Sequence, residues 1–177
     1  EKLSKDANNL TKALKGDVKT QGNWGEVILE RILEKSGLVK DREYYVQNSL
    51  TSEDGKLYRP DVIIHLPDNK KVIIDSKVSL VAYEKFSSSE NTEDQKTHLK
   101  QHILSIKAHI KGLSDKNYQN LYGVDGLDFV LLFIPIEGAF SAALQADNSL
   151  FQEAFDKNVV LVSTSTLLAT LKTIASI

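Results

Sequence analysis

Apolar residues over 27–35 follow the helical period and fall on one side of a helix. They predict a helix with one buried face that ends near Gly37. Glu26 would lie in the first turn of this helix, where a carboxylate favours the helix dipole. Trp24 stands between two glycines and would anchor a close-approach turn before the helix.

Three segments after this helix are predicted to be strands. They cover residues 43–51, 57–66 and 70–78, and the first of them alternates between apolar and polar positions. The dipeptide Asp54-Gly55 is typical of a hairpin turn, and the turn residues 67–69 separate the second strand from the third. These signals predict three consecutive antiparallel strands.

The second half of the chain predicts helices that alternate with buried strands. A long helix is expected from Thr92, as its N-cap, to about Lys111. Its apolar stripe consists of Leu99, Ile103, Ile106, Ile110 and Leu113. The remaining predicted elements are strands over 127–134 and 158–163, short helices over 137–146 and 150–155, and a helix from Thr166 onward. The order α-β-β-β-α-β-α-β-α predicts an α/β fold with a mixed sheet flanked by helices.

The first twenty residues carry an apolar seam with spacings of four and three. The seam residues are Leu3, Ala7, Leu10 and Leu14. They indicate either the end of an upstream coiled coil or an amphipathic helix that packs on its own domain. We therefore predict an N-terminal helical part over 1–20 and one domain over 21–177. The absence of methionine and the start within a helical pattern favour a fragment. The chain end interrupts the helix expected from Thr166 onward, which favours a C-terminal truncation as well.

The composition is that of an ordinary globular protein, with 41% hydrophobic and 26% charged residues among 177. The absence of cysteine excludes disulfides and thiolate metal sites. No apolar run has transmembrane length, and no signal peptide is visible. The net charge of −2 gives no overall attraction to nucleic acid, so any DNA binding would need a local basic face.

Two short motifs bring carboxylates to the ends of the predicted central strands. They are Arg59-Pro60-Asp61 and Asp75-Ser76-Lys77. Asp75 and Lys77 are two residues apart, so on a strand both side chains leave the same face. Mg²⁺ prefers carboxylate oxygens, and a neighbouring lysine could orient an attacking water at a phosphate. The alternative is structural, with Asp61 as a strand-entry residue and Asp75 and Lys77 as an ordinary pair at a strand end.

The register of the hairpin between these strands decides whether the two aspartates can meet. An even loop that pairs Leu66 with Lys71 would set Asp61 opposite Ser76, on the other face from Asp75. A shared ion therefore requires an odd loop or a bulge.

The element order and the acidic positions resemble the PD-(D/E)xK nuclease superfamily, which has a restriction-endonuclease-like αβββαβ core. Its first helix supplies an acidic residue, matched here by Glu26, and its strands supply the two motifs above. The chain also resembles the RmuC family of DNA recombination proteins from about residue 18 onward. The matching segments are Gln21–Glu26, Ser36–Leu38, Arg59–Ile63, Ile74–Tyr83, Leu113–Tyr118 and Phe133–Glu137. Ser76 departs from the resemblance, because the family more often has Ala there.

The resemblance implies a metal-dependent DNA nuclease that acts in recombination and limits rearrangement at inverted repeats. The implied catalytic residues are Glu26, Asp61, Asp75 and Lys77. The three acidic residues would bind Mg²⁺, with Mn²⁺ as a substitute, and the lysine would position the attacking water. Gln47 and Tyr83 could support this site, although structural hydrogen bonding explains them at least as well. Glu137 belongs to the resemblance without an evident role.

Two other functions fit the same sequence. One is a catalytically silent DNA-binding or scaffold module that a coiled coil positions. The other is a metal-dependent hydrolase of a different phosphodiester. The presence of all four catalytic-type residues favours the enzyme, because a decayed site is expected to lose at least one.

The predicted DNA contacts come from lysines of the long helix and the residues just after it. They are Lys96, Lys100, Lys107, Lys111 and Lys116. A solvated helix face is the alternative interpretation. The resemblance further implies a bacterial cytoplasmic protein that could form homo-oligomers through an upstream coiled coil and be tethered to the inner membrane by a preceding segment.

Overall fold

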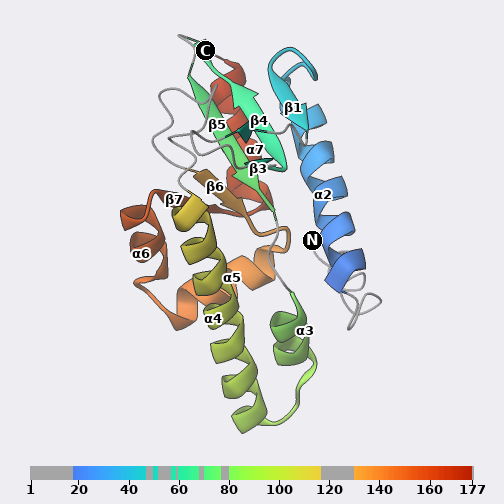
Figure 1. Cartoon of the computed structure of the whole chain (residues 1–177). Coiled ribbons are helices and arrows are strands. Elements are labelled where there is room, and N and C mark those ends of the chain that lie inside the picture. The colour runs from blue at the N-terminus through green and yellow to red at the C-terminus, as the bar shows by residue number, and fades with distance from the viewer. Residues whose placement is uncertain are drawn as a thin grey trace.

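The computed structural model describes residues 18–46, 50–51, 57–58, 60–67, 70–76, 80–116 and 130–176. At the centre of this part of the chain is a five-stranded sheet of the order β1-β4-β5-β6-β7 (Figure 1). Its strands are β1 (Tyr44–Val46), β4 (Val62–His65), β5 (Lys71–Asp75), β6 (Val130–Phe133) and β7 (Val159–Val162). The first three pair antiparallel, whereas β5, β6 and β7 pair parallel. The predicted α/β class with a mixed sheet is confirmed.

Helices cover both faces of the sheet. α2 (Val18–Lys35) and α7 (Thr164–Ala175) share one core cluster with the strands. The helices of the other face are α3 (Val81–Ser88), α4 (Thr92–Lys116), α5 (Glu137–Ala146) and α6 (Leu150–Asp156). In Figure 1, α3 lies beside the first half of α4. None of these helices is long and apolar enough to cross a membrane.

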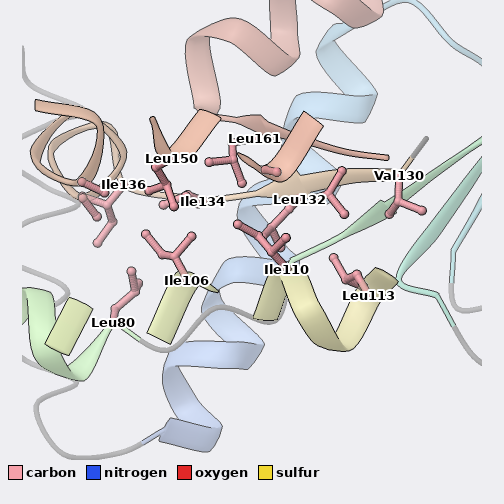
Figure 2. Close-up of a cluster of buried hydrophobic side chains, with 14 of the residues drawn as sticks. Leu80, Ile106, Ile110, Leu113, Val130, Leu132, Ile134, Ile136, Leu150 and Leu161 are labelled. Carbon is pink, nitrogen blue, oxygen red and sulfur yellow. The ribbon is translucent and has the colours of Figure 1, made fainter. Parts of the chain in front are cut away.

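Alternation along the central strands separates two hydrophobic cores. Ile73 belongs to the core beneath α4, whereas Ile74 belongs to the core beneath α2 and α7. β6 is buried along its whole length, as expected of a strand covered on both faces. Figure 2 shows the α4 side, where Ile110 points toward Leu132 of β6 and Ile106 points toward Ile134 and Leu150. The apolar stripe predicted for the long helix therefore fixes α4 against the sheet.

α2 begins earlier than the sequence predicted. Its first residue is Val18, so Trp24 and its flanking glycines lie inside the helix rather than in a turn. Packing overrides the turn preference of glycine here, because Trp24 packs against the core on the α4 side and Gln21 is buried. Glu26 therefore lies outside the first turn, and its predicted dipole role is wrong. The helix also runs continuously across the predicted boundary between residues 20 and 21. Residues 1–17, which carry the predicted seam, lie outside the described ranges.

Three other helix boundaries differ from the predictions. Asn91, rather than Thr92, caps α4. Its Oδ1 accepts hydrogen bonds from the backbone N–H groups of Glu93 (2.8 Å) and Asp94 (3.3 Å). The same helix continues beyond the predicted end near Lys111. α7 begins before Thr166, since the Ser163 hydroxyl accepts a capping hydrogen bond from that residue. α3 was not predicted, whereas the predicted bounds of α5 are confirmed.

The predicted long strands are interrupted. Residues 43–51 contribute to two sheets, because β2 (Leu50–Thr51) pairs with β3 (Leu57–Tyr58) away from the five-stranded sheet. The segment 57–66 is broken at Pro60, which has no N–H to donate to a ladder. β4 starts only after Asp61. The predicted hairpin turn at 54–55 lies outside the described residues.

Candidate functional site

The carboxyl ends of β5, β6 and β7 meet at one edge of the sheet because these strands are parallel. β4 runs antiparallel to β5, so the residue that precedes β4 lies at this edge too. The edge therefore collects Asp61, Asp75, Ser76 and the segment 134–137. In open α/β sheets, ligands bind outside the carboxyl ends of the strands. This edge is the candidate site.

The strand register brings the two predicted aspartates opposite each other. β5 pairs Lys71 with His65 rather than with Leu66. Extended one residue past the Val62–Ile74 pair, the same register places Asp61, which precedes β4, level with Asp75. Residues opposite each other in an antiparallel pair share a face. The odd loop that a shared site requires is thus present.

Asp61 is held against the end of β5. Its side chain is buried, and Oδ2 accepts hydrogen bonds from the Ser76 backbone N–H (2.8 Å) and from the Ser76 hydroxyl (3.0 Å). The serine that departs from the family resemblance therefore supplies one of the two donors. The backbone N–H supplies the other, and an alanine at this position would keep it.

Asp75 is the most deeply buried of the predicted site residues. Its residue is 0% exposed, and it ends β5 beside Leu132 of β6. Nε2 of His109, on α4, lies 3.5 Å from Asp75 Oδ1. A side chain of the helical layer thus lies close to a carboxylate of the sheet edge.

Glu26 lines a pocket together with Asp61. The pocket has a volume of about 230 Å³, and its lining residues are Glu26, Leu29, Glu30, Val46, Asp61 and Val62. α2 also passes close to the sheet edge at Gly25, the residue before Glu26. A Cβ added to Gly25 would lie 3.6 Å from Pro135 Cγ and 4.0 Å from Ser76 O. The helix therefore brings Glu26 beside Asp61, whereas Asp75 is not among the residues that line this pocket.

The donor set at this edge fits Mg²⁺. Within the described part of the chain, no three His, Cys, Asp or Glu side chains lie close enough to hold a metal by themselves. Mg²⁺ does not need three, because it is usually bound by one or two carboxylates together with waters and substrate phosphate oxygens. The buried carboxylates Asp61 and Asp75 carry such hard oxygen ligands, and the pocket beside Asp61 has room for several waters.

Tyr83 packs among three helices. Its ring lies 5.5 Å from the His102 ring of α4 and 6.2 Å from that of Phe86, measured between centroids. A Cβ added to Gly138 of α5 would overlap the Tyr83 hydroxyl. Burial raises the pKa of Tyr83. These contacts join α3, α4 and α5, and the suggested support for the metal site stays a prediction.

Glu137 acquires a structural role. Its Oε1 accepts a hydrogen bond from the backbone N–H of Ser165 at 2.6 Å, in the first turn of α7. The hydroxyl of Thr164 in the same turn donates to Pro135 O at 3.1 Å. A carboxylate at this position satisfies a helix N–H and favours the helix dipole. The segment after β6 is thereby tied to the start of α7.

The lysines of α4 have different surroundings. Nζ of Lys107 lies 3.2 Å from Asp147 Oδ2 and 3.5 Å from Glu153 Oε2, so this lysine already has two acidic partners. Hydrogen bonding to Asp147 is the largest cause of its raised pKa. Lys96 lies 3.8 Å from Glu93 on the exposed surface, and Lys100 and Lys111 are exposed as well. The lysines of the predicted basic face therefore differ in exposure and in their acidic partners.

Three predicted site groups lie outside what the structure describes. They are Lys77, Gln47 and the side chain of Lys116. Their predicted roles stay predictions.

Sequence reasoning missed His109. Its contact with Asp75 depends on how α4 packs on the sheet, since His109 is next to the buried Ile110 on the helix. The apolar period predicts which face of α4 is buried, but it does not predict which strand residue lies opposite. The sequence offered no signal for this contact beyond a histidine beside the stripe.

The fold and the site together define an α/β protein with two buried carboxylates at the carboxyl edge of its sheet. A model of the RmuC family matches residues 1–177, and the chain belongs to this family. It is similar to the DNA recombination protein RmuC homologs of Vibrio cholerae (53% identical over 174 residues) and Pseudomonas aeruginosa (54% over 176 residues). It is also 48% identical over 175 residues to the DNA recombination protein RmuC of Escherichia coli K12.

These alignments cover nearly all of this chain but only part of the relatives. The covered shares of this chain are 98%, 99% and 99%, and those of the three relatives are 34%, 39% and 37%. The chain therefore spans a little over a third of the length of the curated relatives it matches.

Proposed function

We propose that this domain is a Mg²⁺-dependent nuclease that cleaves DNA phosphodiester bonds in the course of recombination. The observation that carries the proposal is that Asp61 and Asp75 are both buried at the carboxyl edge of the sheet, where Asp61 accepts hydrogen bonds from Ser76, the residue that follows Asp75. Two neighbouring buried carboxylates repel each other, and a divalent cation offsets that repulsion. The relatives' name, DNA recombination protein RmuC, supports DNA as the substrate and recombination as the process.

Each residue of the proposed site has a separate task. Asp61 and Asp75 would hold Mg²⁺, with Mn²⁺ as a substitute, and Glu26 would complete or orient its ligand set. Bound Mg²⁺ would lower the pKa of a water and neutralise charge on the phosphate oxygens. Lys77, two residues after Asp75 in the sequence, would orient the attacking water and stabilise negative charge at the phosphorus.

A cleavage assay tests the proposal. The purified protein is incubated with linear, circular, hairpin and branched DNA, with and without Mg²⁺ or Mn²⁺. We expect cleavage that requires the cation and that Asp75→Asn and Lys77→Ala each abolish. Glu90→Gln, which neutralises an exposed acidic residue away from the site, serves as the control and should cleave like the wild type.

Two results would contradict the proposal. One is the absence of cation-dependent cleavage of all four DNA forms, which would favour a silent DNA-binding module. The other is cleavage that persists in both site variants, which would assign the activity to other residues or to a contaminant. Circular dichroism of each variant establishes that the fold is retained.

A further inference from the structure

His109 connects the helical layer to the proposed site. It lies on α4 beside the buried Ile110, and its side chain is 25% exposed. Its Nε2 is 3.5 Å from Oδ1 of Asp75, whose side chain is 1% exposed. The histidine is therefore reachable from solvent on one side and contacts a buried carboxylate on the other.

We propose that His109 is a positioning residue that orients the Asp75 carboxylate for cation binding. This inference rests on the proposed function, because it assumes that Asp75 binds a divalent cation. Carboxylates that bind metals are commonly held by a further hydrogen-bond donor, and removing that donor typically weakens metal binding by about 10- to 100-fold. An imidazole N–H at Nε2 is a suitable donor to Oδ1.

The packing of α4 fixes where this imidazole lies. Ile106, Ile110 and Leu113 are buried against the sheet, so the backbone that carries His109 has little freedom to move. The distance of 3.5 Å from Nε2 to Oδ1 is longer than an ordinary hydrogen bond. Contacts of this kind are often long before a ligand binds and shorten in the complex.

The other two histidines of α4 have different partners. Nε2 of His102 lies 2.8 Å from Ala139 O, and Nδ1 of His98 lies 3.3 Å from Gln101 Oε1. His98 is only partly buried and lies near the other end of the helix from His109. His98→Gln is therefore a matched control, because it replaces a histidine of the same helix whose partner is Gln101 and not Asp75.

Titration with Mn²⁺ alone tests the inference without measuring activity. Isothermal titration calorimetry gives the Kd, and electron paramagnetic resonance of the bound ion reports on its ligand environment. We expect His109→Ala to weaken Mn²⁺ binding by about 10- to 100-fold and to change the spectrum. His109→Gln keeps an N–H donor and should recover part of the affinity, and His98→Gln should bind like the wild type.

The outcomes separate this inference from the proposed function. Wild-type affinity in both His109 variants would overturn the positioning role and leave the cation site standing. No Mn²⁺ binding by the wild-type protein would overturn both. Equal weakening in His98→Gln and His109→Ala would also overturn the inference, because it would show a general effect of altering α4. Melting curves of the variants identify any loss of fold, and the Gln variant keeps the test valid if the Ala variant unfolds.

Discussion

Two carboxylate sites lie at the carboxyl edge of the sheet, and they differ in what faces them. Glu137 is partly exposed and accepts a hydrogen bond from the backbone N–H of Ser165 at the start of α7. Asp75 is fully buried, lies at the same edge as Asp61 and has His109 3.5 Å away. The first carboxylate accepts a hydrogen bond at a helix N-terminus, whereas the second is buried at the end of a central strand, beside His109 and next in sequence to the Ser76 that holds Asp61.

This difference teaches how to separate structural from functional acidic residues. A carboxylate that accepts a helix N–H lowers the free energy of the folded state without a ligand. Buried carboxylates raise the free energy of the folded state, even when hydrogen bonds such as those of Asp61 reduce the cost. Such local unfavourable arrangements are typical of functional sites. Substitutions at the two sites should therefore change different properties.

The largest expected effect is on cleavage. Asp61→Asn should lower the Mg²⁺-dependent cleavage rate by more than about 100-fold, because even the groups that support metal ligands contribute about 10- to 100-fold. Glu137→Gln keeps an acceptor for Ser165 and should leave the rate near that of the wild type. Initial rates on one DNA substrate measure both. Equal losses in the two variants would remove the distinction between the sites.

The lysines of α4 extend the comparison to DNA binding. Lys107 has acidic partners, so Lys107→Gln should leave the salt dependence of DNA affinity unchanged. Lys100 and Lys111 are exposed, and the double substitution to Gln should flatten the slope by about 0.9 log unit for each duplex phosphate that the variant no longer neutralises. Fluorescence anisotropy at several salt concentrations measures the slope. A larger effect of Lys107→Gln than of the double variant would contradict this assignment.

His102 provides a pH-dependent test of a buried group with a backbone partner. Its Nε2 donates to Ala139 O, and Nδ1 has no hydrogen-bond partner among the residues described. Burial lowers the pKa of His102, while the hydrogen bond to Ala139 opposes that shift. The unfolded chain therefore takes up a proton at higher pH than the folded chain. The free energy of unfolding should fall as the pH drops below about 6.5, by up to about 1.4 kcal/mol per pH unit.

His102→Gln cannot titrate and should reduce that slope, whereas His98→Gln should retain it. Urea unfolding at several pH values between about 5 and 7 measures the slope. An unchanged slope in His102→Gln would assign the acid sensitivity to other groups.

The smallest effects concern stability at the two carboxylate sites. Glu137→Ala removes the acceptor for Ser165 and should lower the free energy of unfolding by about 1 kcal/mol. Ser76→Ala removes one of two donors to Asp61, keeps the backbone donor and should lower it by about 1 kcal/mol or less. Urea unfolding compares them. A larger loss of stability in Ser76→Ala would mean that the hydroxyl, rather than the backbone N–H, holds Asp61.

The sequence predicted the layers of this fold better than its details. The apolar stripe around Ile106 correctly predicted the buried face of α4, and the apolar segment of β6 correctly predicted a strand covered on both faces. These predictions succeeded because burial leaves a periodic pattern. The start of α2 was missed because Gly22 and Gly25 normally favour turns, while tertiary packing keeps them helical here.

The candidate site was predictable only in part. Asp61 and Asp75 could be named from their motifs, and the register needed for them to meet could be stated in advance. The sequence did not decide the register, because the turn residues allow loops of either parity. It offered no sign of His109, whose position depends on contacts between distant elements. The cap that Glu137 provides for α7 was invisible for the same reason.

Melting curves of the wild type and Asp75→Asn, each with and without Mn²⁺, test the central claim most directly. Without the cation, we expect Asp75→Asn to be at least as stable as the wild type, because the charge of a fully buried carboxylate is removed. At a Mn²⁺ concentration about 100 times the Kd, the wild type should gain about 2.7 kcal/mol, or roughly 5–10 °C in Tm, and the variant should gain almost nothing. The order of stability of the two proteins would then reverse. Equal shifts in both proteins, or no shift in the wild type, would contradict a cation site at Asp61 and Asp75.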